Sequence, residues 1–542
     1  MKPAGKSAYE SLYFNYPQFD APMGSQREKL TDNATVAIVG AGPIGMTAAL
    51  ALAREGTRSV VFDNKETFND GSRAICVSRA SYYIFESLGV VPPFLKKSLG
   101  WTIGRTFYRG QQILEFEMPD SPDEKFRPMH NIQQQYIESF LWGAVSKNPL
   151  IETRWQSELI GIEDRCDLRV LTIRDPIETY EIKAEWVLAC DGARSETRKL
   201  RGHRLKGENY EGRYVIADVQ MDHNYPTIRR ALFDPDSRRG GTVLVHKQPD
   251  NIWRIDYQLS GDESSEDALK ESTVRDSVAA VLRDIDYEGS WELEWWSVYS
   301  ANTLALDNYR DGNVFFVGDS AHIVPIFGVR GLNNGLADAA NIGWKLGWVL
   351  GGKAGEELLN SYSPERRGAT LDVFANASKS ARFMTPSTYG WKLMRDAALS
   401  TALDHKFAGE LANPRQFTPY IYAESSAVLS DDETFANGPR AGEVLPETTH
   451  EGGFLTDRLS EGFTVLCFKA DCAKALNNRG LDGLQAEALA INSKAANLLG
   501  AEKGTAYIIR PDGHVAARWK NTDADTILAA FRKLTFQDKE AA

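Results

Sequence analysis

The chain has 542 residues, of which 42% are hydrophobic and 25% are charged, and its formal net charge is −12. This length exceeds one ordinary core and predicts several domains, and the near-average composition excludes disordered and fibrous classes. A negative chain without long runs of Lys or Arg is repelled by phosphate backbones and by anionic lipid, so we expect neither nucleic acid nor a membrane as partner.

Residues 1–34 are polar and aromatic without a clear period, and we expect them to pack as an extension over the next domain. The run 35–53 carries no charge and nearly reaches the length of a membrane span. It starts too late for a signal peptide, however, and GAGPIG at its centre interrupts a helix. A strand, a turn and a helix explain the run better, so we predict a soluble protein.

From 35 to 205, apolar strands such as TVAIVG and SVVFD alternate with helices. This rhythm predicts an α/β fold, a doubly wound parallel sheet of the Rossmann type. From 206 to 300, strands follow one another with turns between them and one helix at 266–284. That pattern predicts an inserted, mainly antiparallel sheet that binds the substrate.

The strand–loop–helix rhythm returns at 301–409, which we interpret as the second part of the first domain. Its main helix should end at Gly351-Gly352. Residues 410–450 are rich in Pro, Asn, Glu and Gly and are predicted to form a linker. The last stretch, 451–542, has strands and helices of its own and is predicted to form a separate domain.

Cysteine and histidine usage narrows the chemistry. Five cysteines are an odd and sparse set, which argues against a secreted disulfide framework and favours a cytoplasmic protein. The eight histidines form no HExxH motif and no close pairing with cysteine, so we predict no metal site. A GxSxG motif for a serine nucleophile is also absent.

The first motif is VAIVGAGPIG, in which Gly40, Gly42 and Gly45 have GxGxxG spacing between a strand and a helix. Gly40 permits the turn, Gly42 lets a pyrophosphate approach the backbone, and Gly45 lets helix and strand pack closely. The helix N-terminus then faces the phosphates. Asp63, at the end of SVVFD, is placed to accept hydrogen bonds from an adenosine ribose. This motif predicts a dinucleotide but does not separate NAD from FAD.

The second motif, GDSAHIVPIFGVRGLNNG at 318–335, makes that separation. Asp319 directly follows a buried strand, at the sheet edge where ligands of open α/β folds bind. An acceptor there suits the ribityl chain of FAD. The amides near Gly328, Gly331 and Asn333, with the helix dipole behind them, would face the negative charge of a reduced flavin. The residues of this motif that we expect at the cofactor are Gly318, Asp319, Gly331, Leu332 and Asn333.

This motif resembles the GD motif of the class A flavoprotein aromatic hydroxylases, and GVRGLN is similar to GAKGLN of the para-hydroxybenzoate hydroxylase branch. Many relatives have GxG where this chain has Val329-Arg330-Gly331, but that branch also lacks the first glycine. ACDGARSETR fits the family's DG motif, DGxxSxxR, which begins here at Asp191 and is associated with FAD and the pyridine nucleotide. The resemblance covers roughly residues 35–385.

Two shorter stretches add to the resemblance. SRA at 72–74 is similar to the family's Arg-Ala pair, which implies that Arg73 lies near flavin or phosphate. QQYIE at 134–138 is similar to its Gln-xxx-Glu helix, which implies a cofactor contact for Gln134. The end of the chain, IIRPDGHVAARW, resembles the phenol hydroxylase and 3-(3-hydroxyphenyl)propionate hydroxylase branch, in which a thioredoxin-like domain follows.

That last domain should be a scaffold, because Cys467 and Cys472 are separated by four residues and the CxxC of redox-active thioredoxins is absent. We interpret both cysteines as core residues. The presence of such a domain suggests a homodimer.

The resemblance implies a reaction. NADH or NADPH reduces FAD, O2 adds to give a flavin 4a-hydroperoxide, and its distal oxygen attacks a phenolic or aromatic-acid substrate. Water must be excluded, and the phenol must lose its proton to a base or a hydrogen-bonded relay.

The antiparallel sheet should cover that site. Arg254 aligns with a family arginine that touches the flavin, and His246 on the neighbouring strand is a candidate to hydrogen-bond or deprotonate the phenol. Tyr257 and Pro325 complete the candidate catalytic set. Ordinary core roles for His246 and Tyr257 remain open. We interpret His322 as structural and Arg330 as a solvated loop cation, with a substrate carboxylate or nucleotide phosphates as alternative partners of Arg330.

Two alternatives remain. One is a reductase, oxidase or halogenase on the same scaffold, although WELEWW at 291–296 does not match the WxWxIP signature of halogenases. The other is a flavin-fold binding protein without turnover. The sequence leaves open the aromatic substrate, the position hydroxylated and the choice of NADH or NADPH.

Overall fold

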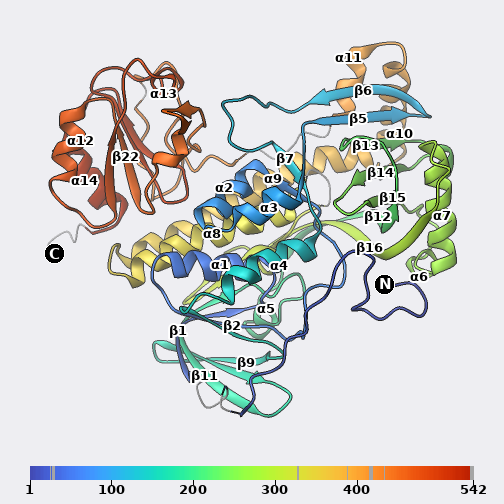
Figure 1. Ribbon diagram of the computed structural model, residues 1–542, viewed down its shortest axis with the longest axis horizontal. Helices are drawn as coiled ribbons and strands as arrows, with labels where there is room; N and C mark the ends of the chain where they lie inside the picture. The colour runs from blue at the N-terminus through green and yellow to red at the C-terminus, as the bar shows by residue number, and fades with distance from the viewer. Residues whose placement is uncertain are drawn as a thin grey trace.

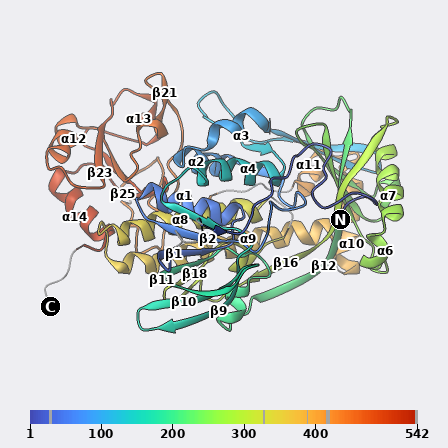
Figure 2. The ribbon, with the colours of Figure 1, turned by 60° about the horizontal axis from the view of Figure 1, so that its bottom comes forward.

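The computed structural model describes residues 1–24, 26, 31–325, 329–386, 388–413, 419–432 and 434–537. Figure 1 shows the long axis of the molecule, with the C-terminal sheet at one end, the parallel sheet near the middle and the large antiparallel sheet at the other end. Figure 2 shows the same arrangement after rotation, with the N-terminus beside the antiparallel sheet.

The central sheet has the order β17-β18-β11-β1-β2-β8, and its neighbours from β18 to β8 are paired in parallel. The bounds are β17 Arg310–Asp311, β18 Val314–Phe316, β11 Thr179–Ala189, β1 Asn33–Val39, β2 Ser59–Phe62 and β8 Ile151–Arg154. Two further strands, β10 (Leu168–Arg174) and β9 (Glu158–Arg165), continue from β11 in antiparallel fashion. The predicted α/β fold with a parallel sheet is therefore present.

Helices α1 (Pro43–Arg54), α4 (Gln134–Val145) and α8 (Gly331–Leu350) lie together over this sheet (Figure 1). Their apolar residues and the strands leave the sheet buried, which explains the continuous apolar run of β1. Pro43 stands at the start of α1, where a residue without a backbone N–H breaks no helical hydrogen bond. α8 ends at Leu350 with Gly351 as its C-cap, at the predicted position.

The second sheet has the order β19-β16-β12-β15-β14-β13-β5-β6. The bounds are β19 His322–Ile323, β16 Trp291–Ala305, β12 Lys206–Met221, β15 Ile252–Gln258, β14 Thr242–Lys247, β13 Arg229–Phe233, β5 Ile103–Tyr108 and β6 Gln111–Glu117. All neighbours are antiparallel except β13 and β5. The sequence pattern placed this sheet at 206–300, but the hairpin β5–β6 joins its edge, because local periodicity does not say which sheet a hairpin extends.

One face of the second sheet is covered by α7 (Glu271–Asp284), with α6 (Ser265–Ala268) before it. Trp253, Ile255 and Tyr257 of β15 pack there with apolar residues of α7. Because side chains alternate along a strand, the residues between them point to the opposite face. That opposite face approaches a small sheet of β3 (Cys76–Ser78), β7 (Met129–Asn131) and β4 (Leu99–Trp101), since Asn131 donates to Lys247 O at 2.8 Å.

Two helices lie between β3 and β4 in the chain, namely α2 (Arg79–Ser87) and α3 (Val91–Lys97), and they share a hydrophobic core with α4. A short helix, α5 (Glu196–Leu200), follows β11. After α8 come α9 (Tyr362–Met384), α10 (Tyr389–Ala402) and α11 (Lys406–Gly409). Met384 of α9 and Leu399 of α10 pack against the second sheet beside Leu244, so these helices close part of its inner face.

The C-terminal sheet has the order β23-β22-β24-β25. The bounds are β22 Phe463–Cys467, α12 Ala470–Asn477, β23 Leu484–Ala488, α13 Lys494–Leu498, β24 Ala506–Ile509, β25 Val515–Trp519 and α14 Ala524–Leu534. Only β22 and β23 are parallel. α12 and α14 share a core with Trp344 and Trp348 of α8. Cys467 and Cys472 are both buried and free, in line with a packing role.

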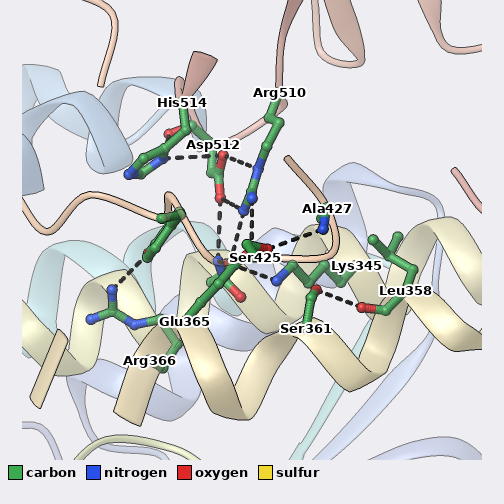
Figure 3. A network of polar contacts seen from close by, with 12 residues as sticks. Lys345, Leu358, Ser361, Glu365, Arg366, Ser425, Ala427, Arg510, Asp512 and His514 are labelled. Carbon is green, nitrogen blue, oxygen red and sulfur yellow. Dashed lines mark hydrogen bonds and ion pairs between the residues drawn. The ribbon is translucent and has the colours of Figure 1, made fainter. Parts of the chain in front are cut away.

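A buried polar network attaches this sheet to the rest of the chain (Figure 3). Arg510 and Asp512, in the turn after β24, point toward α8 and α9. Arg510 Nη1 lies 2.7 Å from Glu365 Oε1, and Lys345 Nζ lies 2.6 Å from Glu365 Oε2. Trp344 Nε1 donates to Asp512 at 3.2 Å. The C-terminal sheet is thus held directly on α8, whose first turn carries the second glycine motif.

The N-terminal extension also connects the sheets. Its Phe14 packs on Phe68 and Tyr136 of the central part, and the Met1 ammonium donates to Trp296 O of β16 at 2.5 Å. In the parts of the chain that the structure describes, each helix is too short or too polar to cross a lipid bilayer. Within the same residues, no three His, Cys, Asp or Glu side chains are grouped in a way that could hold a metal ion.

Candidate functional site

Four neighbouring parallel strands end in register at one edge of the central sheet. Val39 pairs with both Phe62 and Ala189, and Ala189 pairs with Phe316. At about 4.8 Å per strand, this row is about 14 Å long. The residues just beyond it are Asp63, Gly40, Asp191 and Asp319. The fold therefore brings the GxGxxG, DG and GD motifs together at one carboxyl edge, as the sequence predicted.

The three glycines of the first motif have three different surroundings. Gly40 has a φ of +105°, and a Cβ there would lie 2.5 Å from Cys190 O. A Cβ on Gly45 would lie 1.8 Å from Gly40 O, so this position must be glycine for packing. Gly42 has no atom within 4 Å of its would-be Cβ, and no side chain caps the N-terminus of α1 behind it. Gly42 thus leaves open space before a helix N-terminus, a geometry that suits a phosphate.

Asp63 holds the glycine loop in place. Its Oδ2 accepts the Ala41 N–H at 2.8 Å and its Oδ1 accepts the Lys65 N–H at 3.0 Å. Each carboxylate oxygen retains a second lone pair, so a ribose hydroxyl can still donate to Asp63. The predicted ribose contact stays a prediction, and the loop contact is an additional role.

Asp319 is accessible to solvent at this edge, and desolvation by the surrounding protein raises the pKa of its carboxyl. Among the charges that counteract this shift are Arg73 and Arg198. Arg198 donates to Ser320 O at 3.0 Å and to Ala193 O at 2.7 Å. The DG loop is therefore bound directly to the GD loop.

Asp191 offers an acceptor that the protein leaves unused. Its Oδ2 accepts the N–H and the hydroxyl of Thr197, each at 2.9 Å. Its Oδ1 is buried and has no hydrogen-bond partner among the described residues. Burial raises the pKa of this carboxyl. A buried acceptor without a partner is costly, and a hydroxyl of a bound dinucleotide would satisfy it.

The start of α8 is fixed by side chains rather than left free. Asn333 Oδ1 accepts from Ser78 N at 2.9 Å and from the Ser81 hydroxyl at 2.7 Å, and its Nδ2 donates to Val329 O at 2.7 Å. The side chain of Asn333 is thus used within the protein, so any flavin contact at this position comes from backbone amides. Gly331 and Leu332 form the first turn of α8, while Gly328 lies outside the described residues.

The residues around this turn differ in part from expectation. His322 is fully buried, and its Nε2 lies 2.6 Å from Asp338, which supports the structural interpretation. Asp338 also accepts the Gly318 N–H at 3.1 Å. Pro325 is buried. Arg330 is only 5% exposed and donates to Val373 O at 3.4 Å, so the expectation of a solvated loop cation was wrong. Its long stem packs inward where the sequence pattern suggested an exposed loop.

Arg73 and Gln134 are brought together. The Ala74 N–H donates to Gln134 Oε1 at 3.3 Å, and the Gln134 N–H donates to the Ser72 hydroxyl at 2.9 Å. Gln134 Nε2 donates to Glu138 at 2.8 Å. Gln134 therefore positions the loop that carries Arg73, and Arg73 itself is exposed beside Asp319.

Arg254 lies beneath that loop. It pairs with Asp218 through Nε at 2.7 Å and Nη2 at 3.1 Å, and it also donates to Ser72 O. His246 is its cross-strand neighbour. Burial, with Arg229 and Arg254 nearby, holds the pKa of His246 well below its usual value, so the imidazole is neutral. The structure thus brings Arg254 and His246 together below the Arg73 loop.

Tyr257 is not part of this arrangement. It points to the α7 side of the sheet, where it packs with Val274 and where the Arg238 guanidinium lies 4.5 Å from its ring. His246 and Arg254 point to the other face. The catalytic expectation for Tyr257 is corrected by this alternation, since residues one step apart along a strand face opposite sides.

Two charged residues that were not among the predicted site residues lie on the same face as His246. Asp256 is 4% exposed, and burial raises its pKa to about 7. Arg229 is also 4% exposed. A signal was available in RRALF, because two adjacent arginines at the start of a buried strand cannot both point toward solvent.

Comparisons with known proteins agree with this geometry. A family profile described as FAD binding domain matches residues 33–377. A 3-(3-hydroxy-phenyl)propionate/3-hydroxycinnamic acid hydroxylase of Mycobacterium sp. (strain JLS) is 26% identical over 448 residues, which cover 81% of this chain and 77% of the relative. The protein of the same description from Klebsiella pneumoniae is 27% identical over 442 residues, 80% of this chain and 78% of the relative.

Solved structures share the fold. The flavin-dependent monooxygenase PieE, in complex with FAD and substrate, matches with a TM-score of 0.77 at 21% identity, covering 93% of this chain and 99% of that chain. Aklavinone-11 hydroxylase, in a ternary complex with FAD and aklavinone, matches with a TM-score of 0.75 at 22% identity, covering 94% and 100%. The likeness extends over the C-terminal sheet as well as the central one.

Proposed function

Because the chain belongs to the class A FAD-dependent aromatic hydroxylase family, we propose that it hydroxylates a phenolic or aromatic-acid substrate with O2 and with NADH or NADPH as reductant. It is an FAD-dependent monooxygenase, and FAD as cofactor is confirmed by the family match. The observation that carries the proposal is the row of strand ends, which gathers three flavin-associated motifs on one edge.

The residues at this edge fit FAD. Gly42 and the N-terminus of α1 would hold the pyrophosphate, Asp63 the adenosine ribose and Asp319 the ribityl chain. Asp191 would use its free oxygen on a cofactor hydroxyl, and Arg73 would balance negative charge. The amides from Gly331 to Asn333 would face the flavin ring. When bound, FAD supplies electron acceptance from the nicotinamide and activation of O2.

The protein itself would bind and orient the substrate and exclude water from the reacting groups. The inner face of the second sheet, closed by α9 and α10, would cover the ring of the substrate. His246 is neutral and has an unpartnered Nδ1 among the described residues, so it can accept a hydrogen bond from the phenolic hydroxyl. Arg254 would keep the Arg73 loop in position and Pro325 would shape the flavin loop. The route of oxygen transfer implied by the family resemblance stays a prediction.

We also propose the division of the chain expected above, with a thioredoxin-like C-terminal domain. Its support is a four-stranded sheet with α12 and α14 on one side and α13 on the other. That domain contacts α8 and α9, so its role would be structural. A homodimer and a cytoplasmic location remain predictions.

The function is tested with purified protein and FAD. We expect a yellow holoenzyme whose NAD(P)H oxidation is stimulated by one or a few phenols or aromatic acids, and whose product carries one added oxygen atom by mass spectrometry. Oxygen uptake that ends only in hydrogen peroxide for every compound would favour a reductase or oxidase. A flavin that NAD(P)H never bleaches, even with an aromatic ligand present, would favour a binding protein.

A further inference from the structure

One row of side chains crosses five strands on the inner face of the second sheet. Asp218 pairs with Arg254, and Arg254 pairs with His246. The next position in the row is Arg229, because its neighbour Arg230 pairs with Val245, and Arg229 itself pairs with Gly104 of β5. At two strand spacings, Arg229 stands about 10 Å from Arg254.

The two arginines of this row differ in their partners. Arg254 is neutralised by Asp218 through two hydrogen bonds. Arg229 is 4% exposed, and among the described residues its side chain makes no hydrogen bond and no ion pair within 4.0 Å, while its Nε and Nη1 are buried. Gly104 on its far side contributes no charge. An isolated buried cation is strongly unfavourable unless a partner is supplied.

The adjacent Arg230 is also buried, but its guanidinium is stabilised by aromatic rings. Arg230 points to the other face, where its guanidinium lies 3.8 Å from the centre of the Tyr225 ring and 5.5 Å from that of Trp253. Such stacking stabilises a cation without hydrogen bonds. Within the described part of the chain, Arg229 has no ring of this kind.

Asp256 is the carboxyl whose charge acts on Arg229, but no ion pair within 4.0 Å joins the two side chains among the described residues. His246 is neutral and 5% exposed, and its Nδ1 lacks a partner in the described residues. Asp256 also has an unpartnered oxygen, and its closest cation is Arg254 at 3.9 Å. Three polar side chains on neighbouring strands thus share a face with unused hydrogen-bonding atoms, and the residues packed over them include the uncharged thiol of Cys76.

We propose that Arg229, with His246 beside it, binds a carboxylate of the aromatic substrate. A planar guanidinium matches a carboxylate in shape and charge, and the neutral imidazole adds an N–H donor. Since Arg254 marks the flavin side of the row, a carboxylate at Arg229 would place the ring between the two arginines. This inference rests on the proposed function and narrows it to aromatic acids.

The test compares acids with their uncharged analogues. Hydroxybenzoates, hydroxyphenylacetates and 3-(hydroxyphenyl)propionates are titrated into the FAD-loaded enzyme, each beside its primary amide, and the flavin absorbance change gives Kd. For an acid that binds, Arg229→Met should raise Kd about ten- to hundredfold, with little change for the amide. Arg229→Lys, which keeps the charge but not the fork, should lie between. Arg230→Met is the matched control and should leave the preference for acids unchanged.

The outcomes separate this inference from the proposed function. Equal binding of acids and amides by the unaltered enzyme, or equal weakening of both by Arg229→Met, would overturn the carboxylate site even if neutral phenols were hydroxylated. Arg229-dependent binding of an acid without any hydroxylated product would support the site and overturn the function. If Arg229→Met does not fold, Arg229→Lys and His246→Gln decide the question by the same acid-to-amide ratio.

Discussion

Glu365 of α9 and Arg510 of the C-terminal sheet form a doubly hydrogen-bonded ion pair, with Nη1–Oε1 and Nη2–Oε2 distances of 2.7 and 3.0 Å. Their side chains are 1% and 0% exposed. Arg366, which follows Glu365 on α9, donates to Asp338 at 2.6 Å. Asp338 in turn accepts the N–H of Gly318. A short chain of buried polar contacts therefore runs from the C-terminal sheet to the loop that carries Asp319.

The first prediction concerns this pair. Arg510→Met should lower the free energy of unfolding by about 3 kcal/mol, because it leaves part of the charge of a buried carboxylate uncompensated. Lys345 remains beside Glu365 and limits the loss. Lys520→Met is the control, since its ion pair with Glu502 is exposed and should contribute less than about 1 kcal/mol. Chemical denaturation measures both. If both variants lost a similarly small free energy of unfolding, the buried ion pair would not stabilise the protein more than the exposed one.

The second prediction uses the open space at Gly42. Gly42→Val should abolish or greatly weaken FAD binding while the protein without flavin keeps its unfolding temperature, because a Cβ at this position has no protein atom within 4 Å. Gly143→Ala, also in open space but on α4, is the control and should retain FAD. Flavin absorbance per chain after desalting gives the occupancy. Full retention of FAD in Gly42→Val would show that no phosphate approaches this turn.

The third prediction concerns Asp319. Asp319→Ala should weaken FAD binding about tenfold, the effect of one lost hydrogen bond. Asp319→Asn keeps one acceptor oxygen and should lose less. Fluorescence titration of the flavin-free protein with FAD measures both constants. FMN also has a ribityl chain, so Asp319→Ala should weaken FMN binding by a similar factor. If FMN affinity were unchanged, Asp319 would contact a part of FAD other than the ribityl chain.

The fourth prediction concerns the pH dependence from Asp256, whose folded pKa is about 7 against a usual value of 3.8. A carboxyl with a raised folded pKa contributes stability that is present below pH 3.8 and is lost as pH rises through 7. Asp256→Asn cannot ionise. The unfolding free energy of the unaltered protein, minus that of Asp256→Asn, should therefore fall by an amount on the order of a few kcal/mol between pH 5 and pH 8.

The opposite trend from His246, whose folded pKa is lowered, is common to both proteins and cancels in this difference. Asp218, Arg229 and Arg254 are the other charged groups that act on Asp256, and the substitution leaves them in place. A difference that stays constant with pH would mean that Asp256 is ionised in the folded protein across this range.

Local patterns in the sequence were sufficient for much of the fold. The apolar runs at 35–39 and 59–62, with the glycines between them, predicted a strand, a turn and a helix, and β1, α1 and β2 are found there. The same spacing identified Gly40 as the turn glycine and Gly45 as the glycine of the close helix–strand contact, and the structure shows that a Cβ would clash at both positions. Such features depend on backbone geometry within a few residues, which composition and period encode directly.

The partners of charged side chains could not be read in the same way. Arg330 was expected in solvent and is buried, and Arg229 was not singled out at all. The hairpin at 103–117 gives no local sign that it completes the sheet next to β13. These outcomes depend on which strands become neighbours, and strand order is set by packing between segments that are far apart in the chain.

By itself the sequence determined the α/β class, the three motifs and the flavin chemistry that they imply, because glycine turns and strand ends are properties of short segments. Only the tertiary structure decided which face of the second sheet each residue occupies. It placed Tyr257 in the core against α7 and left Arg229, His246 and Asp256 together on the inner face. The physical reason is that burial and charge balance are sums over all surrounding segments, and no single segment contains them.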